Sequence, residues 1–424
     1  MIPHADADIP AIFVQVASYR DPQLVPTLRD CVARASHPGR LTFGICWQRD
    51  DGESLEEFAG DPRLRVVEVD YRESKGTCWA RNKVQSLYAG EAYTLQIDSH
   101  HRFVEGWDDL LISMMAQTGS AKPILSCYAP SFDPFDLSRL RDETPWALGF
   151  DRFTPEGVLF MRPREMADWQ TIVRPIPSRY FSGHFAFAPG VFCREVPYDP
   201  NYYFHGEEIS IAVRAFTHGY DLFCPHRVVL WHEYTRKYRT KHWDDHVAEK
   251  GAQVPWTVRN DDSLRRNRIL LGMEDGDVDF GAYGFGTART LRDYEDYAGI
   301  NFRLRLVQPY TYENRPPPNP EIYSGDAEWH ARATKEFWTR IRLPDGLPAP
   351  DADVDFWYVG VHDEDGNEMH RADIPADEVA RILAQPRAEF IHQYRAYRKA
   401  KTWTVWPHSP QRGWLEKVTG PLAG

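Results

Sequence analysis

The chain has 424 residues, enough for two or three domains and a large buried core. Hydrophobic residues make up 42% and charged residues 26% of it, which excludes a small disulfide scaffold and a largely disordered chain. The formal net charge of −12 argues against a general affinity for nucleic acid or anionic membranes. An anionic ligand would therefore need a local basic pocket.

Strand and helix patterns alternate along the first half of the chain. We predict strands at 12–17, 41–47, 64–69 and 93–97, with helices at 23–35 and 77–89. The pattern then becomes mixed, with strands predicted at 124–128, 185–188 and 222–224 and a helix at 208–217. Such alternation predicts an α/β fold whose ligands bind beyond the carboxyl ends of parallel strands.

A proline-rich segment divides the predicted domains. Residues 312–320 hold four prolines, fit no regular element and are interpreted as a linker. Beyond them we predict a hairpin within 355–373, a helix at 375–383 and a strand at 402–406. The expected organisation is a catalytic domain over 1–311, a linker over 312–320 and a small, mostly β accessory domain over 321–424.

The six cysteines are scattered and form no CxxC pair; they are Cys31, Cys46, Cys78, Cys127, Cys193 and Cys224. This spacing favours buried reduced thiols over disulfides or a thiolate metal site. The N-terminus lacks the pattern of a secretory signal, and no stretch is apolar enough for a membrane span. We therefore expect a cytoplasmic enzyme or binding protein.

Three residues form a candidate metal site. Asp98 ends the strand predicted at 93–97, and extended alternation aims His100 the same way. One carboxylate and one imidazole suit Mn²⁺ better than Ca²⁺, although an Asp-x-His triplet alone is equally compatible with an Asx turn. His232 ends another apolar strand and offers a third ligand.

Two basic features could neutralise a diphosphate. Residues 236–241 carry four cations in an acidic protein, although such a run can also be an ordinary solvated face. Gly76 precedes the helix predicted at 77–89, and the helix N-terminus together with Arg81 would attract an anion. Alone, this second feature is equally compatible with a capped helix.

The ordered motifs of the chain resemble a known family. They are VASYRD, KGTCWARN, QIDSHHRF, FHGEEISIAVRAFTHGYDLFCP, LWHEYTR and GAYGFGTARTLRDYEDYAGINF. From about residue 11 to 303 the sequence is similar to the GlcNAc-transferases that include Skp1 hydroxyproline α-N-acetylglucosaminyltransferases, and its middle is similar to polypeptide GalNAc-transferases. The resemblance implies a GT-A fold and a retaining glycosyltransferase that uses a UDP-sugar, with GlcNAc expected, and Mn²⁺ or Mg²⁺.

The resemblance also implies roles for individual residues. Asp98, His100 and His232 would bind the metal. Uridine would meet Ser18, Arg20 and Asp21, and the donor diphosphate would meet Lys75, Arg81, Asp98, Arg236 and Lys237. Glu207 and Glu208 start a helix, where acidic residues are also favoured electrostatically. Because consecutive helical residues diverge by ~100°, we expect Glu208 to face the sugar or acceptor and Glu207 to support the helix start.

Two other functions remain open at this stage. A metal-dependent hydrolase could use the three ligands to activate water, and a degenerate fold could bind sugar nucleotides or glycans without turnover. Retention could proceed on the leaving-group face, with UDP oxygen taking the acceptor proton, or through a carboxylate nucleophile. The acceptor hydroxyl could belong to a protein or to a glycan.

Overall fold

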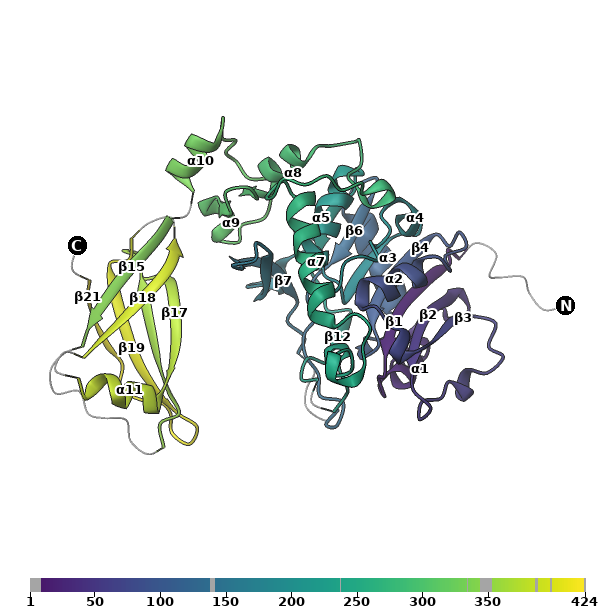
Figure 1. The fold of residues 1–424 in the computed structure, drawn as a ribbon, viewed down its shortest axis with the longest axis horizontal. Helices are drawn as coiled ribbons and strands as arrows, with labels where there is room; N and C mark the ends of the chain where they lie inside the picture. Colours follow the sequence, from purple (N-terminus) through teal and green to yellow (C-terminus); the bar gives the residue numbers. More distant parts are fainter. Residues whose placement is uncertain are drawn as a thin grey trace. The chain divides into compact units, whose positions relative to one another are not determined.

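The computed structural model describes residues 9–137, 142–236, 238–333, 335–343, 353–385, 388–396 and 399–422. The chain divides into two compact units (Figure 1). The first unit runs to Arg305 and adds Asn314–Ile322, whereas the second comprises Leu306–Glu313 and the chain from Tyr323 onward. Among the described residues, every helix is too short or too polar to cross a bilayer.

An eight-stranded mixed sheet forms the centre of the first unit, in the order β3-β2-β1-β4-β10-β6-β11-β9. Its strands are β1 (Ile12–Tyr19), β2 (Leu41–Arg49), β3 (Leu64–Asp70), β4 (Tyr93–Asp98), β6 (Pro123–Ser126), β9 (Ile176–Pro177), β10 (Phe185–Pro189) and β11 (Asp221–Cys224). Strands β3, β2, β1 and β4 are parallel, whereas β10 is antiparallel to both β4 and β6. The predicted α/β fold is confirmed.

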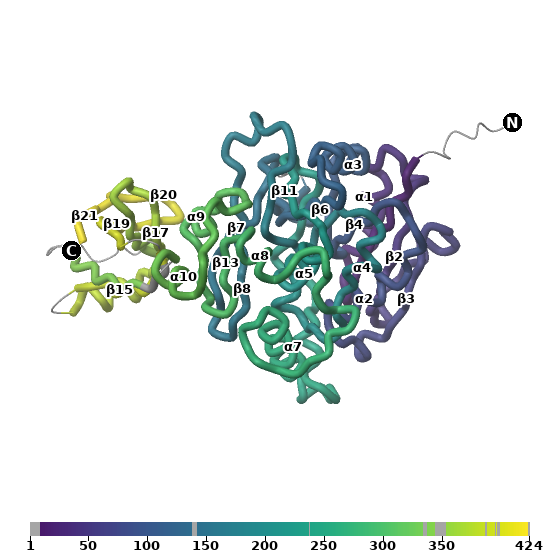
Figure 2. Tube along the Cα trace, turned by 90° about the horizontal axis from the view of Figure 1, so that it is seen from above, coloured from purple at the N-terminus to yellow at the C-terminus, as the bar shows by residue number. Residues whose placement is uncertain are grey.

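Helices cover both faces of this sheet (Figure 2). The helices of this unit are α1 (Leu24–Arg34), α2 (Thr77–Gln85), α3 (Trp107–Gln117), α4 (Phe192–Glu195), α5 (Glu207–Thr217), α6 (His242–Asp245), α7 (Trp256–Leu270) and α8 (Leu291–Ala298). Val14 and Val16 of β1 pack with α1 and α3, whereas Phe13 packs with Ala80 of α2 on the opposite face. Because β1 is buried on both faces, its sequence is an almost unbroken apolar run.

Short elements complete the first unit. Strand β5 (His101–Phe103) pairs with β12 (Leu230–His232), β7 (Trp146–Phe153) forms a hairpin with β8 (Leu159–Glu165), and β13 spans Ile300–Asn301. Single 3-10 turns occur at Pro38–Arg40, Glu56–Phe58, Tyr71–Glu73, Trp169–Thr171, Ala248–Lys250 and Gly281–Tyr283.

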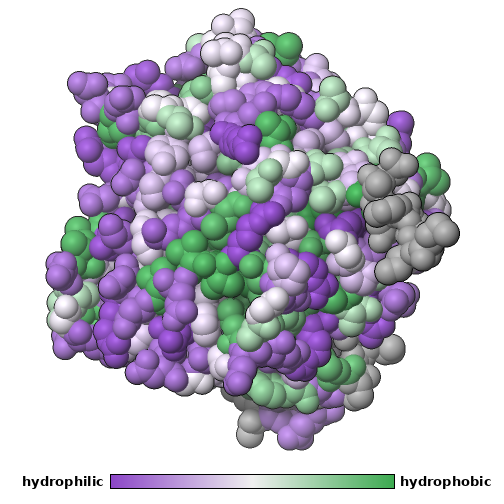
Figure 3. Space-filling view, turned by 90° about the vertical axis from the view of Figure 1, so that its right-hand side faces the viewer, coloured by the Kyte–Doolittle hydropathy of each residue, from purple (hydrophilic) through white to green (hydrophobic). Residues whose placement is uncertain are grey.

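One face of the molecule, seen in Figure 3, is mostly hydrophilic, and its largest group of hydrophobic residues lies near the centre.

The second unit is mostly β and has a core of its own. It contains β14 (Leu306–Val307), α9 (Pro309–Tyr312), α10 (Asp326–Arg332), β15 (Lys335–Arg342), β16 (Phe356–His362), β17 (Glu368–Pro375), α11 (Ala376–Leu383), β18 (Glu389–Ala396), β19 (Thr402–Ser409), β20 (Gly413–Trp414) and β21 (Val418–Pro421). A five-stranded sheet runs β17-β16-β19-β20, with β21 also paired to β19, and β15 pairs with β18. Val359, Val361 and Val379 lie in its core.

Most of the proline-rich segment packs into the first unit. The guanidinium of Arg179 donates to the Arg315 carbonyl at 2.6 Å and to the Asn319 side chain, while the Asn319 amide donates to the Tyr297 carbonyl at 3.0 Å. Pro317 is buried. The segment therefore has fixed contacts over part of its length, and the division into 1–311, 312–320 and 321–424 stays a prediction.

Candidate metal and donor site

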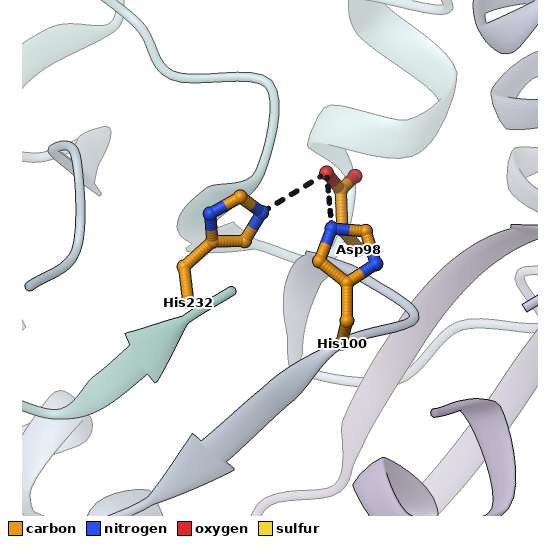
Figure 4. A group of neighbouring side chains, drawn as sticks. All are labelled: Asp98, His100 and His232. Carbon is orange, nitrogen blue, oxygen red and sulfur yellow. Dashed lines mark ion pairs between the residues drawn. The ribbon is translucent and has the colours of Figure 1, made fainter. Parts of the chain in front are cut away.

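Three side chains from two separate β elements meet at the carboxyl end of β4. Asp98 is the last residue of β4, and His100 lies in the short turn before β5. Strand β12 pairs with β5 so that His232 lies opposite His101, which brings it to the same place from more than 130 residues further along the chain (Figure 4). The sheet topology thus assembles the predicted metal-ligand set.

The three ligand atoms are close enough to share one ion. All lie within 4.8 Å of one another, and Nε2 of His100 and Nε2 of His232 lie 3.7 and 3.5 Å from Oδ2 of Asp98. Neither ring nitrogen of the buried His232 has a hydrogen-bond partner among the described residues. Because buried polar atoms are normally paired, this unpartnered imidazole fits a metal ligand. An O,N,N donor set suits a divalent ion such as Mn²⁺.

The protonation states also suit metal binding. Burial lowers the pKa of His232 well below its ordinary value and keeps the imidazole neutral, the form that binds metals. Burial opposes ionisation of Asp98, but the neighbouring His232 and Arg81 outweigh it and hold the pKa of this carboxyl well below its usual range. The site therefore places the carboxylate of Asp98 close to the neutral imidazole of His232.

Arg81 joins the candidate metal ligands to the acidic start of α5. Its Nη2 donates to Oδ1 of Asp98 at 3.0 Å, and its Nη1 donates to Oε1 of Glu207 at 2.8 Å. The buried Arg81 is thus held between two carboxylates.

Gly76 precedes α2 with φ +113, and a Cβ there would lie 2.7 Å from the Tyr203 ring, so a glycine is needed at this position.

Glu207 and Glu208 have different partners. Glu207 is buried and bonds to Arg81, whereas Glu208 accepts hydrogen bonds from the Gly183 amide at 2.7 Å and the Tyr128 hydroxyl at 2.8 Å. Burial raises the pKa of Glu207 to about 8, although the charge of Arg81 opposes this shift. Burial also raises the pKa of Glu208. The two neighbours therefore line the same cavity with different hydrogen-bond partners.

A cavity of about 290 Å³ joins these groups. Its lining includes Asp98, His232, Arg81, Glu207, Glu208, Tyr128, Gly183, His184, Tyr234 and Arg236, with an apolar wall of Val158, Leu159, Phe160, Met161 and Phe204. The His184 ring stacks on His232, with 4.3 Å between ring centroids, and its Nε2 accepts from the Ala129 amide at 3.1 Å. Its Nδ1 lies 3.2 Å from the Ser182 hydroxyl, so His184 borders the cavity with both ring nitrogens already hydrogen-bonded.

Of the residues expected to meet uridine, Ser18 lies in β1 and Arg20 and Asp21 follow it, and two of the three are buried. Ser18 and the side chain of Asp21 have no exposed surface. Oδ2 of Asp21 lies 2.7 Å from Nδ1 of His100, so this carboxylate contacts the histidine of the candidate metal site. The expected contact of Asp21 with uridine stays a prediction.

Arg20 is held by two acidic residues. It has φ +44, forms ion pairs with Asp50 at 2.8 Å and Asp245 at 2.7 Å, and lies 4.4 Å from the Tyr71 ring centroid. Lys75 is exposed in the loop before α2. Nucleotide contacts by Ser18, Arg20 and Lys75 stay predictions.

The basic segment after His232 lies beside the same site. Arg236 lines the cavity and lies 5.8 Å from the ring centroids of both Phe204 and Trp243, whereas Lys237 lies outside the described residues. Nη2 of Arg239 lies 2.9 Å from Nε2 of His100. The donor roles of Arg236 and Lys237 stay predictions.

A family model described as Glycosyltransferase (GlcNAc) matches residues 11–60 and 52–304. The chain belongs to this glycosyltransferase family. Its α/β sheet agrees with the expected GT-A architecture. A comparison with curated proteins gave no match.

Several solved structures are similar to this chain over part of its length. GalNAc-T7 with UDP, GalNAc and Mn²⁺ is 13% identical, with a TM-score of 0.43 over 56% of this chain and 46% of that chain. S. aureus TarS 1-349 is 9% identical, with a TM-score of 0.36 over 61% of this chain and 72% of that chain. The mannosyltransferase PcManGT from Pyrobaculum calidifontis with GDP-Man and Mn²⁺ is 15% identical, with a TM-score of 0.37 over 64% of this chain and 77% of that chain. The chain spans under half of the GalNAc-T7 chain, and similarity this weak transfers no substrate or metal.

Sequence reasoning did not identify several residues of the glycosyltransferase site. Tyr128 and Gly183 hold Glu208, and Phe160 belongs to a hairpin that was not predicted. Arg239 was part of the basic segment but had no individual role. Each of these residues reaches the site through tertiary contacts, so no local motif marks it.

Proposed function

We propose that this glycosyltransferase transfers GlcNAc from UDP-GlcNAc to a hydroxyl of a protein or glycan, with retention of anomeric configuration. The observation that carries the proposal is that Asp98 and His232 border the same cavity as the carboxylates Glu207 and Glu208. A nucleotide sugar needs a cation for its diphosphate and polar groups for its sugar and acceptor. One cavity bordered by both sets of groups supports such a reaction.

Asp98, His100 and His232 would hold Mn²⁺ or Mg²⁺. When bound, the ion supplies positive charge that stabilises the leaving UDP. Arg236 borders the cavity and adds a cation on the same side, and Lys75 and Lys237 are proposed to assist it. Arg81 is proposed to add positive charge near the donor, because its guanidinium contacts Asp98 and Glu207 at the cavity.

Glu208 is proposed to orient the sugar or acceptor rather than attack the anomeric carbon. Its two oxygens accept from the Gly183 amide and the Tyr128 hydroxyl, and burial raises its pKa. A carboxylate that is both hydrogen-bonded and disposed to hold a proton is a poor nucleophile. These contacts favour transfer on the leaving-group face, where a UDP oxygen receives the acceptor proton.

The apolar wall contributed by the β8 side of the cavity would exclude water from the sugar. Val158, Leu159 and Phe160 lie there. Exclusion of water favours transfer to an acceptor over hydrolysis of the donor.

The cytoplasmic location expected above is retained as a proposal, since all six cysteines are buried free thiols.

A donor screen tests the proposal. The purified full chain is incubated with Mn²⁺, lysate from its native host and each of several UDP-sugars, and acceptors are analysed by intact mass. The proposal expects a mass gain of one N-acetylhexosamine with UDP-GlcNAc. UDP release without any modified acceptor would instead support the hydrolase, and donor binding without UDP release would support a non-catalytic binding protein.

A further inference from the structure

His100 has a different partner at each ring nitrogen. Nδ1 lies 2.7 Å from Oδ2 of Asp21, and Nε2 lies 2.9 Å from Nη2 of Arg239. The Asp21 side chain is fully buried and that of Arg239 is 13% exposed. Both contacts of this histidine therefore lie in the interior of the protein.

Asp21 fixes the orientation and the tautomer of His100. An ionised carboxylate only accepts hydrogen bonds, so Nδ1 must carry the proton and the lone pair must be at Nε2. Asp21 is itself held by the Gln23 amide at 2.9 Å and the Ser99 hydroxyl at 2.8 Å. Metal-binding histidines commonly have such a carboxylate partner on the nitrogen away from the metal.

Arg239 occupies the opposite side of the same ring. Its guanidinium donates to the Nε2 lone pair, and it is anchored by Asp21 at 3.6 Å and by the fully buried Glu233 at 3.5 Å. One lone pair cannot serve an arginine and a metal ion at the same time. The contact must therefore break before His100 becomes a ligand.

We propose that Asp21 is the positioning residue that prepares His100 for metal, and that Arg239 competes with the metal for Nε2 of His100. This inference rests on the metal site of the proposed function. Arg239 acts as an internal cation that occupies the ligand atom, and metal binding releases it from His100. The basic segment that follows His232 is thereby coupled to metal occupancy.

The two parts of the inference predict opposite effects on metal affinity. Asp21→Asn should weaken Mn²⁺ binding by ~10–100-fold, the usual effect of losing an outer partner of a ligand. Arg239→Met should tighten Mn²⁺ binding severalfold, because it removes the competitor and keeps an apolar stem. The affinity of the metal-stripped full chain for Mn²⁺ alone is measured by calorimetry, with thermal melting as the check of folding.

Two matched variants separate these effects from general ones. Asp108 is another fully buried carboxylate, bonded to Arg40 and to the Ser36 and His37 amides, so Asp108→Asn should lower stability but leave Mn²⁺ affinity unchanged. Arg236→Met removes the same charge near the cavity without a contact to His100. If general electrostatics governed the result, Arg236→Met and Arg239→Met would tighten binding equally, which would overturn the competition.

The outcomes also distinguish this inference from the proposed metal site. Mn²⁺ binding that Asp98→Ala abolishes, together with unchanged affinity in both the Asp21 and Arg239 variants, overturns the inference and keeps the site. Wild-type protein that binds no Mn²⁺ overturns both. If Asp21→Asn fails to fold, the Arg239 variant still tests the inference, because Arg239→Met alone must tighten Mn²⁺ binding.

Discussion

Glu207 and Glu208 are consecutive residues whose carboxylates have different partners, Arg81 of α2 for Glu207 and the Gly183 amide before β10 for Glu208. This divergence predicts different phenotypes. Glu208→Gln should reduce transfer strongly and leave UDP affinity near the wild-type value, because the altered group faces the sugar or acceptor. Product mass measures transfer, and calorimetry measures UDP binding.

A matched carboxylate gives the control for Glu208. Glu195 also accepts from a tyrosine hydroxyl, that of Tyr220 at 2.7 Å, but it does not line the cavity. Glu195→Gln should leave transfer unchanged. Unaltered transfer in Glu208→Gln would refute the assignment.

Glu207→Gln should mainly reduce stability. It weakens the hydrogen bond that the Glu207 carboxyl accepts from the buried Arg81, and we expect a loss of ~1–3 kcal/mol in the free energy of unfolding. Denaturant titration measures this change. If Glu207→Gln were as stable as the wild type but inactive in transfer, the roles of the two glutamates would be exchanged.

The raised pKa of Glu207 also predicts a pH dependence of stability. In the folded state Glu207, which faces Arg81 and Glu208, holds its proton up to a pKa of about 8, whereas an unfolded glutamate has a pKa of ~4.3. Its contribution is therefore complete below the unfolded pKa and is lost as pH rises through the folded pKa. Between pH ~5 and ~8, the melting temperature of the metal-free wild type should fall more steeply than that of Glu207→Gln. Parallel curves would contradict this.

Loss of a metal ligand should remove most turnover. Asp98→Ala and His232→Ala each delete one of the three candidate ligands, so activity should fall by more than the ~10–100-fold that outer-shell changes cost. His226→Ala is the control, since His226 is equally buried but does not line the cavity. Circular dichroism and melting curves separate lost function from lost fold, and full activity in EDTA would exclude the metal.

Ligand binding should protect the basic segment from proteolysis. Arg236, Arg239 and Lys241 are potential trypsin sites, and we expect UDP plus Mn²⁺ to hold the segment over the donor as a closed loop. Cleavage should slow severalfold with both ligands present. Equal cleavage rates with and without them would count against loop closure.

The sequence predicts the parts of this fold that depend on local patterns. Strands β1 and β4 are short apolar runs that end in polar residues, so both strands and the place of Asp98 could be predicted. His232 could be predicted as a ligand because it ends another such run. The accessory hairpin of β16 and β17 also follows from strand patterns around a glycine turn.

Other features depend on contacts that sequence distance conceals. Asp21 lies 79 positions from His100. Its neighbours in the sequence indicate a polar loop, so the sequence favours a contact between Asp21 and a ligand and does not show the buried contact with His100. Helix α7 was not predicted, because only Ser263, Leu264, Asn267 and Leu270 are buried in it and its apolar periodicity is weak. The proline-rich segment was interpreted as a linker because its contacts with Arg179 come from a residue well over 100 positions away.

One measurement tests the central claim, that this site transfers an N-acetylhexosamine from a UDP-sugar with the help of a metal ion. Wild-type protein and Asp98→Ala are each given UDP-GlcNAc and host lysate, with Mn²⁺ or with EDTA, and acceptor masses are recorded. The account predicts an N-acetylhexosamine mass gain only for the wild type with Mn²⁺. The same gain in EDTA or in Asp98→Ala would contradict it.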